Sequence, residues 1–223
     1  MKLLTLNKKS HGHALKKRHL VTYSNPDSII SDQFRTIRTN ITFLTAENQN
    51  KVILVTSPGK REGKSTTTAN LAVSMAGQKE RVLLIDASIR EPAIHRIFKV
   101  QNETGLTDVL TYKATLEEVI CKPGIGKLDI LPSGSTSSHN PAELLGSDTM
   151  ENLLTEVTKE YDIVLIDSPT VLKSTETRVL ANQCDGVVLV VSRGKTSIEK
   201  AVEARKILAL SKSKLVGTIM NEK

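Results

Sequence analysis

The chain has 223 residues, of which 39% are hydrophobic and 25% are charged, so it can bury the core of a sizeable domain and is not a wholly disordered protein. Aromatic residues make up only 3% and tryptophan is absent, which argues against a stacking surface for single-stranded nucleic acid. The two cysteines, Cys121 and Cys184, cannot form a disulfide framework or a four-ligand zinc site, and they fit a reducing compartment.

The net charge of +7 is concentrated near the N-terminus. The first 22 residues contain six basic residues and no acidic one, whereas the remainder is nearly neutral. We therefore predict a basic, flexible N-terminal arm over residues 1–26, which is either solvated or in contact with an anionic membrane surface. The neutral remainder argues against a nucleic-acid partner. No apolar run approaches the roughly 18 residues of a membrane-spanning helix, so we expect a cytoplasmic protein that reaches a membrane only through this arm or a partner.

A helix is predicted over residues 27–45, because its apolar residues recur at intervals of four and three and form one stripe. Asp32, Arg35 and Arg38 fall on the other side of this helix. That polar face is either exposed to solvent or pairs with a neighbouring subunit. The predicted apolar stripe consists of Ile30, Phe34, Ile37, Ile41 and Leu44.

Short, branched apolar runs alternate with longer helical patterns along the rest of the chain, which is typical of parallel strands buried on both faces. Between residues 99 and 147 we expect a strand within 128–134, a surface loop and a helix from Ala142. The fold class is therefore α/β, a three-layer sandwich with a mostly parallel sheet and helices on both faces, in one domain over residues 27–223. The predicted strands are 52–55, 82–85, 163–166, 187–191 and 215–220, and the predicted helices are 64–78 and 196–209.

The segment 51–72 has the strand, loop and helix order of a P-loop. In such a loop Gly63 lets backbone N–H groups approach phosphate oxygens, Lys64 provides a positive charge, and Ser65 offers a hydroxyl to Mg²⁺. The motif is a variant, because its usual first glycine would fall at Pro58. The candidate nucleotide-binding residues are Gly59, Lys60, Arg61, Glu62, Gly63, Lys64, Ser65 and Thr66.

Two aspartates end predicted strands that follow the P-loop in the sequence. Asp86 follows the apolar run 82–85, and Asp167 follows the run 163–166. A single aspartate in this position is often a helix cap or a turn residue, but two of them beside a phosphate loop indicate a functional pair. We predict that Asp86, Asp167 and Ser65 hold Mg²⁺, and that Lys64, Asp86 and Asp167 are catalytic.

Seven segments in the same order resemble the bacterial tyrosine kinases of capsular and exopolysaccharide biosynthesis, which are P-loop proteins related to partition and cell-division-site ATPases. The resemblance covers about residues 27–221. The segments are DQFRTIRTNITF (32–43), TSPGKREGKSTTTANLA (56–72), VLLIDASIREP (82–92), GL (105–106), LPSGSTSSHNPAELLGS (131–147), YDIVLIDSP (161–169) and CDGVVLVVSRGKTS (184–197).

The resemblance implies an ATP-dependent protein-tyrosine kinase that requires Mg²⁺, with Asp86 activating the tyrosine hydroxyl and Asp167 supporting the metal. The family's E-x-x-R-x-x-R oligomerisation motif corresponds to Asp32, Arg35 and Arg38, which implies a homo-oligomeric ring. It further implies activation by a separate membrane modulator of polysaccharide chain length, which would hold the kinase at the inner face of the cell membrane. Its substrates would be proteins with accessible tyrosines.

This sequence departs from the family pattern at three places. Ser88 stands where the D-x-D-x-R motif has its second aspartate, Lys60 and Arg61 stand where small residues are common, and no tyrosine cluster follows the last predicted strand. These departures argue against autophosphorylation and against a full catalytic rate, and they keep two alternatives open. The chain could be a catalytically weak, ATP-binding scaffold of the polysaccharide machinery, or a partition-type ATPase.

Overall fold

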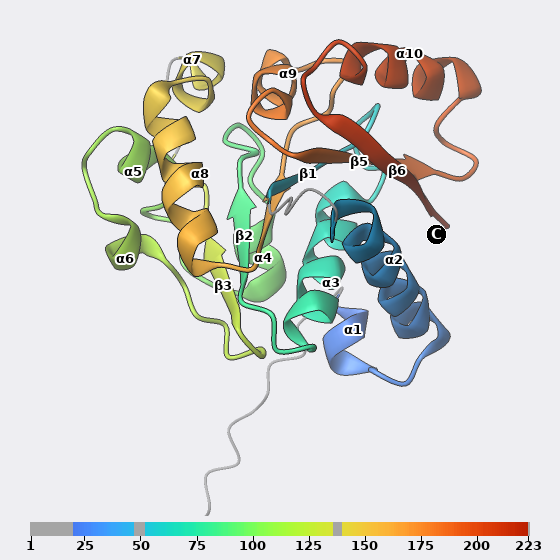
Figure 1. The fold of residues 1–223 in the computed structure, drawn as a ribbon, viewed down its shortest axis with the longest axis horizontal. Coiled ribbons are helices and arrows are strands. Elements are labelled where there is room, and N and C mark those ends of the chain that lie inside the picture. Colours follow the sequence, from blue (N-terminus) through green and yellow to red (C-terminus); the bar gives the residue numbers. More distant parts are fainter. Residues whose placement is uncertain (1–19, 47–51, 136–139, 223) are drawn as a thin grey trace, which may run out of the picture.

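The computed structural model describes residues 20–46, 52–135 and 140–222. Its centre is a six-stranded, all-parallel sheet in the order β3-β2-β4-β1-β5-β6, shown in Figure 1. The expected α/β fold is thereby confirmed. The strands are β1 (Val52–Thr56), β2 (Val82–Asp86), β3 (Leu128–Leu131), β4 (Ile163–Asp167), β5 (Gly186–Ser192) and β6 (Lys214–Asn221).

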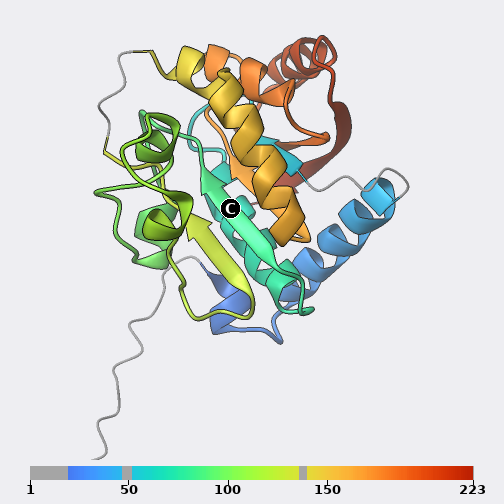
Figure 2. The same cartoon turned by 60° about the vertical axis from the view of Figure 1, so that its left-hand side comes forward.

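Helices cover both faces of the sheet, and each face has its own apolar core (Figures 1 and 2). The strands β1, β2, β4 and β5 are buried along their whole length, because alternate side chains enter opposite cores. On one face lie α1 (Val21–Ser24), α2 (Ile29–Ala46), α3 (Lys64–Ala76) and α4 (Ile94–Phe98). On the other lie α5 (Leu106–Leu110), α6 (Leu116–Val119), α7 (Pro141–Leu145), α8 (Asp148–Glu160), α9 (Thr175–Ala181) and α10 (Ile198–Leu208).

The five predicted strands are all present, and β3 forms where the looser middle region was expected to contribute one. The predicted helices 64–78 and 196–209 correspond to α3 and α10. The sequence analysis did not predict the short helices α1, α4, α5 and α6, nor α8 and α9. Part of the expected surface loop, residues 136–139, lies outside the described residues. Within the described part of the chain, no helix is long and apolar enough to cross a membrane.

The helix α2 confirms the prediction for 27–45, but its apolar stripe is only partly buried. Ile41 is buried, and Phe34 and Ile37 pack against the core beside α3, whereas Ile30 is half exposed, contrary to the expectation. The first turn of α2 faces α1 through Ser31 instead, whose hydroxyl donates to the Asn25 carbonyl at 2.7 Å. A polar contact therefore takes the place of the apolar one. The Leu44 side chain lies outside the described residues.

The expected boundary between arm and domain, at residue 26, falls inside a packed region. Leu20, which precedes α1, is fully buried in the core on the α3 side of the sheet. Thr22 is joined to Asn70 of α3 by three hydrogen bonds of 3.0–3.2 Å. Residues 20–26 therefore belong to the domain, because a buried leucine and satisfied polar groups anchor them. The basic residues of the predicted arm lie outside the described part of the chain.

Candidate active site

The predicted site residues gather at the carboxyl edge of the sheet, where β1, β4 and β2 end side by side. The loop 57–63 joins β1 to the first turn of α3, and Lys64 and Ser65 begin that helix. Asp86 and Asp167 are direct register partners at the ends of β2 and β4. The parallel sheet thus places two buried carboxylates next to a glycine-containing loop, although 80 residues separate them in the sequence.

The loop is braced from within by the carboxylate of Glu62. Only 3% of this residue is exposed; its Oε2 accepts from the Gly59 N–H at 2.7 Å, and its Oε1 accepts from the Thr196 hydroxyl at 2.6 Å. The sequence analysis grouped Glu62 with the nucleotide-binding residues. Its side chain is an internal support of the loop, and only its backbone can face a phosphate.

Residues far along the chain hold the carbonyl groups of this loop. The amino group of Lys195 donates to the carbonyls of Lys60 and Arg61, each at 2.8 Å, and Asn221 Nδ2 donates to the Glu62 carbonyl at 3.0 Å. In a trans peptide the C=O and N–H groups point in opposite directions. Tying the carbonyls to one side therefore leaves the N–H groups on the other side, where they can receive an anion.

Gly63 is required by both its backbone and its surroundings. Its φ is +88°, in the left-handed region, and a Cβ atom there would lie 2.0 Å from Asn221 Nδ2. The side chains of Lys60, Arg61 and Thr66 are exposed, and that of Lys60 forms a surface ion pair with Glu91. Three polar side chains thus surround the rim of the loop, while its base is closely packed.

Lys64 reaches from the loop to the carboxylate of Asp167. Its Nζ lies 2.7 Å from Asp167 Oδ1 and 3.0 Å from Ser65 Oγ, and Thr68 donates to the same Asp167 oxygen at 3.3 Å. Asp167 is fully buried, and its Oδ2 is an acceptor without a hydrogen-bond partner in the described part of the chain. An unpaired buried carboxylate oxygen beside a serine hydroxyl fits a divalent cation.

Asp86 is fully buried and accepts three backbone N–H groups. Its Oδ1 accepts from Ser88 at 3.1 Å, and its Oδ2 accepts from Ala93 and Ile94 at 2.9 Å each. It therefore also holds the start of α4. Burial, together with the charge of Asp167, raises the pKa of Asp86 to about 7, although the backbone hydrogen bonds oppose the shift. A carboxyl group with such a pKa can accept a proton near neutral pH.

The predicted polar face of α2 is divided by the structure. Asp32 and Arg35 are exposed and paired, and Arg35 also donates to the Pro26 carbonyl at 2.8 Å. Arg38, expected on the same outward face, instead turns to α3 and donates to the carbonyl and hydroxyl oxygens of Ser74 at 2.6 and 3.3 Å. The expectation was wrong for Arg38, because the contact between α2 and α3 is wider than the apolar stripe.

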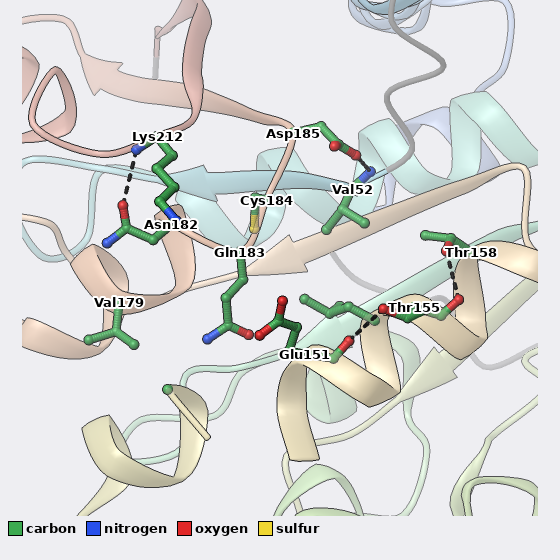
Figure 3. A pocket seen from close by; sticks show the side chains of 12 residues that line it. Val52, Glu151, Thr155, Thr158, Val179, Asn182, Gln183, Cys184, Asp185 and Lys212 are labelled. Carbon is green, nitrogen blue, oxygen red and sulfur yellow. Dashed lines mark hydrogen bonds between the residues drawn. The ribbon is translucent and has the colours of Figure 1, made fainter. Parts of the chain in front are cut away.

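A separate groove of about 730 Å³ lies at the opposite edge of the sheet (Figure 3). Its lining includes Val52, the first residue of β1, and Asp185, which precedes β5. Its lining is largely polar, as Glu151 and Gln183 in Figure 3 illustrate. This groove lies away from the paired carboxylates and shares no residue with them.

Sequence reasoning missed the supports of the site. Lys195, Thr196 and Asn221 contact the loop from the segment after β5 and from the end of β6. Arg90 is likewise held by the buried Glu176 of α9, at 3.0 Å. The only signal for Lys195, Thr196 and Asn221 was the polar stretch that follows the strand 187–191 and the asparagine that ends the last strand. Neither indicates which loop it contacts.

Comparisons with known proteins identify relatives of this chain. A family model described as an AAA domain matches residues 50–213. The tyrosine-protein kinase YwqD of Bacillus subtilis (strain 168) is 44% identical over 216 residues, which are 97% of this chain and 90% of that protein. The tyrosine-protein kinase CpsD of Streptococcus agalactiae (serotype III, strain NEM316) is 34% identical over 86% of this chain and 82% of its own length.

Solved structures share the overall fold of this chain. The chimerical protein CapA2B2 superimposes with a TM-score of 0.87 at 32% identity, covering 91% of this chain and 89% of its own. The kinase domain of the Escherichia coli tyrosine kinase ETK gives a TM-score of 0.87 at 29% identity, covering 91% and 79%. The Pyrococcus furiosus cell division ATPase MinD shares the fold alone, with a TM-score of 0.67 at 20% identity over 77% and 72% of the two chains.

Proposed function

The chain belongs to the AAA-domain family and, within it, to the bacterial tyrosine-protein kinases, and we propose that it transfers the γ-phosphoryl group of ATP to protein tyrosines at the carboxyl edge of its sheet. The observation that carries this proposal is the pair of buried carboxylates, Asp86 and Asp167, beside the Lys64 amino group. Phosphoryl transfer depends on positioning and on neutralising charge. This cluster offers the Lys64 ammonium group as one cation, and its carboxylates can hold a metal ion as a second.

Lys64, Ser65 and Asp167 form the proposed nucleotide and metal site. The loop 59–66 receives the phosphates through its N–H groups, and Lys64 exchanges part of its contact with Asp167 for a phosphate oxygen. Ser65 and Asp167 hold Mg²⁺, which supplies charge neutralisation to the phosphates when bound. The described residues contain no cluster of three or more His, Cys, Asp or Glu side chains suited to a metal ion. A magnesium ion held by one or two side chains and the substrate phosphates needs no such cluster.

Asp86 is the proposed proton acceptor for the tyrosine hydroxyl. Its raised pKa makes it a better base than an ordinary carboxylate near neutral pH. Because three backbone N–H groups fix its oxygens, the carboxylate needs no reorganisation when a hydroxyl approaches. We assign it this role together with a contribution to the metal site.

The resemblance to the capsular and exopolysaccharide kinases extends the proposal to partners and place. A separate membrane modulator of polysaccharide chain length would activate the chain at the cytoplasmic face, where the basic arm could also contact anionic lipid. Asp32 and Arg35 are exposed and available to a neighbouring copy in a homo-oligomeric ring. Arg38 could contribute only by releasing Ser74, or through atoms that its present hydrogen bonds leave free.

One observation favours the alternative of an ATP-binding scaffold with weak transfer activity. Ser88 replaces the second acid of the family motif, and both oxygens of Asp86 already accept backbone hydrogen bonds. Fewer free carboxylate oxygens then remain for a metal ion. A Ser88→Asp variant that transfers phosphate much faster than the parent chain would support this alternative.

The experiment measures phosphotyrosine on a random copolymer of glutamate and tyrosine, with ATP, Mg²⁺, the purified chain and the cytosolic segment of its membrane modulator. We expect the signal to disappear in Lys64→Ala, which loses the only amino group placed beside Asp167 in the described residues. The matched control is Lys127→Ala, because Lys127 is exposed at the opposite edge of the sheet, before β3. Equal signals from Lys64→Ala and the parent chain would refute the proposed site. If the parent chain gives no signal but still binds ATP, the kinase activity is refuted and the ATP-binding scaffold is the function that remains.

A further inference from the structure

The three tyrosines of this kinase differ sharply in their surroundings. Tyr161 is 7% exposed, and its hydroxyl donates to Asp129 at 2.9 Å, so its oxygen cannot reach another molecule. Tyr23 is 48% exposed, and the neighbouring Thr22 fixes its backbone to α3. Tyr112 is 83% exposed and lies on the connection between α5 and α6, where its hydroxyl makes one surface hydrogen bond, 3.0 Å long, to Thr149.

Tyr112 also adopts a backbone conformation that its residue type does not favour. Its φ is +56°, in the left-handed region, just after the C-terminal end of α5. Glycine or asparagine is the usual residue there, and a bulky residue in that region costs about 1–2 kcal/mol. The ring is almost fully solvated, so burial of the side chain does not offset this cost. Neither packing nor backbone preference therefore explains a tyrosine at this position, which suggests a role for its hydroxyl.

Tyr112 and the phosphate loop lie on parts of the fold that are several strands apart. The phosphate loop follows β1, whereas the first residues of α5 bond to residues 132 and 133, just after β3. Three strand intervals separate β1 from β3, a span of about 14 Å at the usual spacing. Figures 1 and 2 both show α5 and α6 beside β3, at the far edge of the sheet. A second copy can bring its own phosphate site to this exposed hydroxyl without any change in the strand order that separates the two within one copy.

We infer that Tyr112 is a phosphorylation site of this kinase, modified in trans by a second copy of the chain. The inference rests on the proposed function, because it uses the same site and ATP. The Tyr112 oxygen attacks the γ-phosphorus, a P–O bond to the tyrosine forms, and the bond from the γ-phosphorus to its bridging oxygen breaks. ADP leaves with that electron pair, and the phenolic proton passes to the Asp86 carboxylate of the donor copy.

Phosphorylation at this position would also alter the contact with α8. The phosphate adds a charge of about −1.5 to −2 and removes the hydroxyl hydrogen that Thr149 can accept. Thr149 lies in the first turn of α8, which already carries the acids Asp148 and Glu151. Repulsion between these charges favours separation of the α5–α6 connection from α8. The modification thus changes this surface without touching the phosphate site.

The experiment mixes an untagged parent chain as donor with an affinity-tagged Lys64→Ala chain as acceptor, in the presence of ATP, Mg²⁺ and the modulator segment. The tagged acceptor is recovered, digested with trypsin and analysed by mass spectrometry. Cleavage after Lys99 and Lys113 yields residues 100–113, in which Tyr112 is the sole tyrosine. We expect phosphate on this peptide, and we expect the acceptor to lose most of its phosphotyrosine when it also carries Tyr112→Phe.

Two controls separate the inference from the proposed function. An acceptor with both Lys64→Ala and Tyr23→Phe should be phosphorylated to the same extent as the Lys64→Ala acceptor, because its exposed Tyr112 is retained. The copolymer of glutamate and tyrosine is assayed with the same donor. If the copolymer is phosphorylated and residues 100–113 are not, the inference is overturned and the proposed function stands. If the copolymer is not phosphorylated either, both are overturned.

Discussion

Replacement of Gly63 by alanine tests whether the end of β6 supports the phosphate loop. The alanine Cβ would lie 2.0 Å from Asn221 Nδ2, so the asparagine side chain must move and lose its 3.0 Å hydrogen bond to the Glu62 carbonyl. The left-handed backbone costs alanine about 1–2 kcal/mol, and the lost hydrogen bond about 1 kcal/mol. Alanine also restricts the unfolded chain, which returns about 0.4–1 kcal/mol, so the net loss is about 2 kcal/mol.

The control is Gly124→Ala, at a glycine with a similar φ of +72° but with no atom within 4 Å of the added Cβ. It carries the backbone cost alone, so we expect it to be about 1 kcal/mol less destabilising than Gly63→Ala. Because the chain has no tryptophan, urea unfolding is best followed by far-ultraviolet circular dichroism. The loss in Gly63→Ala corresponds to a fall in Tm of roughly 4–8 °C.

A double-mutant cycle with Asn221→Ala isolates the contact. The single change Asn221→Ala removes the same hydrogen bond, so the double variant should lose about 1 kcal/mol less than the sum of the two single losses. Gly124→Ala combined with Asn221→Ala should be additive, because the two sites share no contact. Equal losses for Gly63→Ala and Gly124→Ala, or an additive Gly63–Asn221 cycle, would refute the reasoning.

Two further predictions concern α2 and the start of β4. Arg38→Ala should lower the free energy of unfolding by about 1–2 kcal/mol, because it removes two hydrogen bonds to Ser74. Arg35→Ala, at an exposed arginine, should lower it by under about 0.5 kcal/mol in the same urea unfolding experiment. Equal losses from the two variants would contradict this prediction. Burial, with the hydrogen bond to Asp129, raises the pKa of Tyr161 above its ordinary 10.0, so its stabilising contribution is complete below that pH and is lost as the pH rises further. Tyr161→Phe should therefore flatten the alkaline decline in the free energy of unfolding, and an unchanged slope would show that other groups cause the decline.

The phosphate loop could be predicted because its chemistry lies in adjacent residues. Gly63, Lys64 and Ser65 each have a residue type that phosphate binding requires, and an apolar strand and a helical pattern flank them. Asp86 and Asp167 could be predicted for a related reason, since parallel strands bring their carboxyl ends to one edge. That they are direct register partners, with one oxygen of Asp167 unpaired, required the strand order.

The errors have equally specific causes. A helical wheel assigns one face to the core, but α2 contacts α1, α3 and β6. Arg38 is therefore held against α3, while Ile30 is half exposed. The boundary at residue 26 followed charge composition, which cannot show that Leu20 is buried in the core.

The amino-acid sequence by itself determined the alternation of strands and helices, the phosphate loop and the two strand-end aspartates, because these depend on residue type and on short-range periodicity. The tertiary structure alone decided how the loop is supported and which tyrosine is accessible. Glu62, Lys195 and Asn221 come together across more than 130 residues of chain, and Tyr112 is exposed whereas Tyr161 is buried. Such contacts arise from the packing of whole elements, and local sequence patterns carry no record of which elements meet.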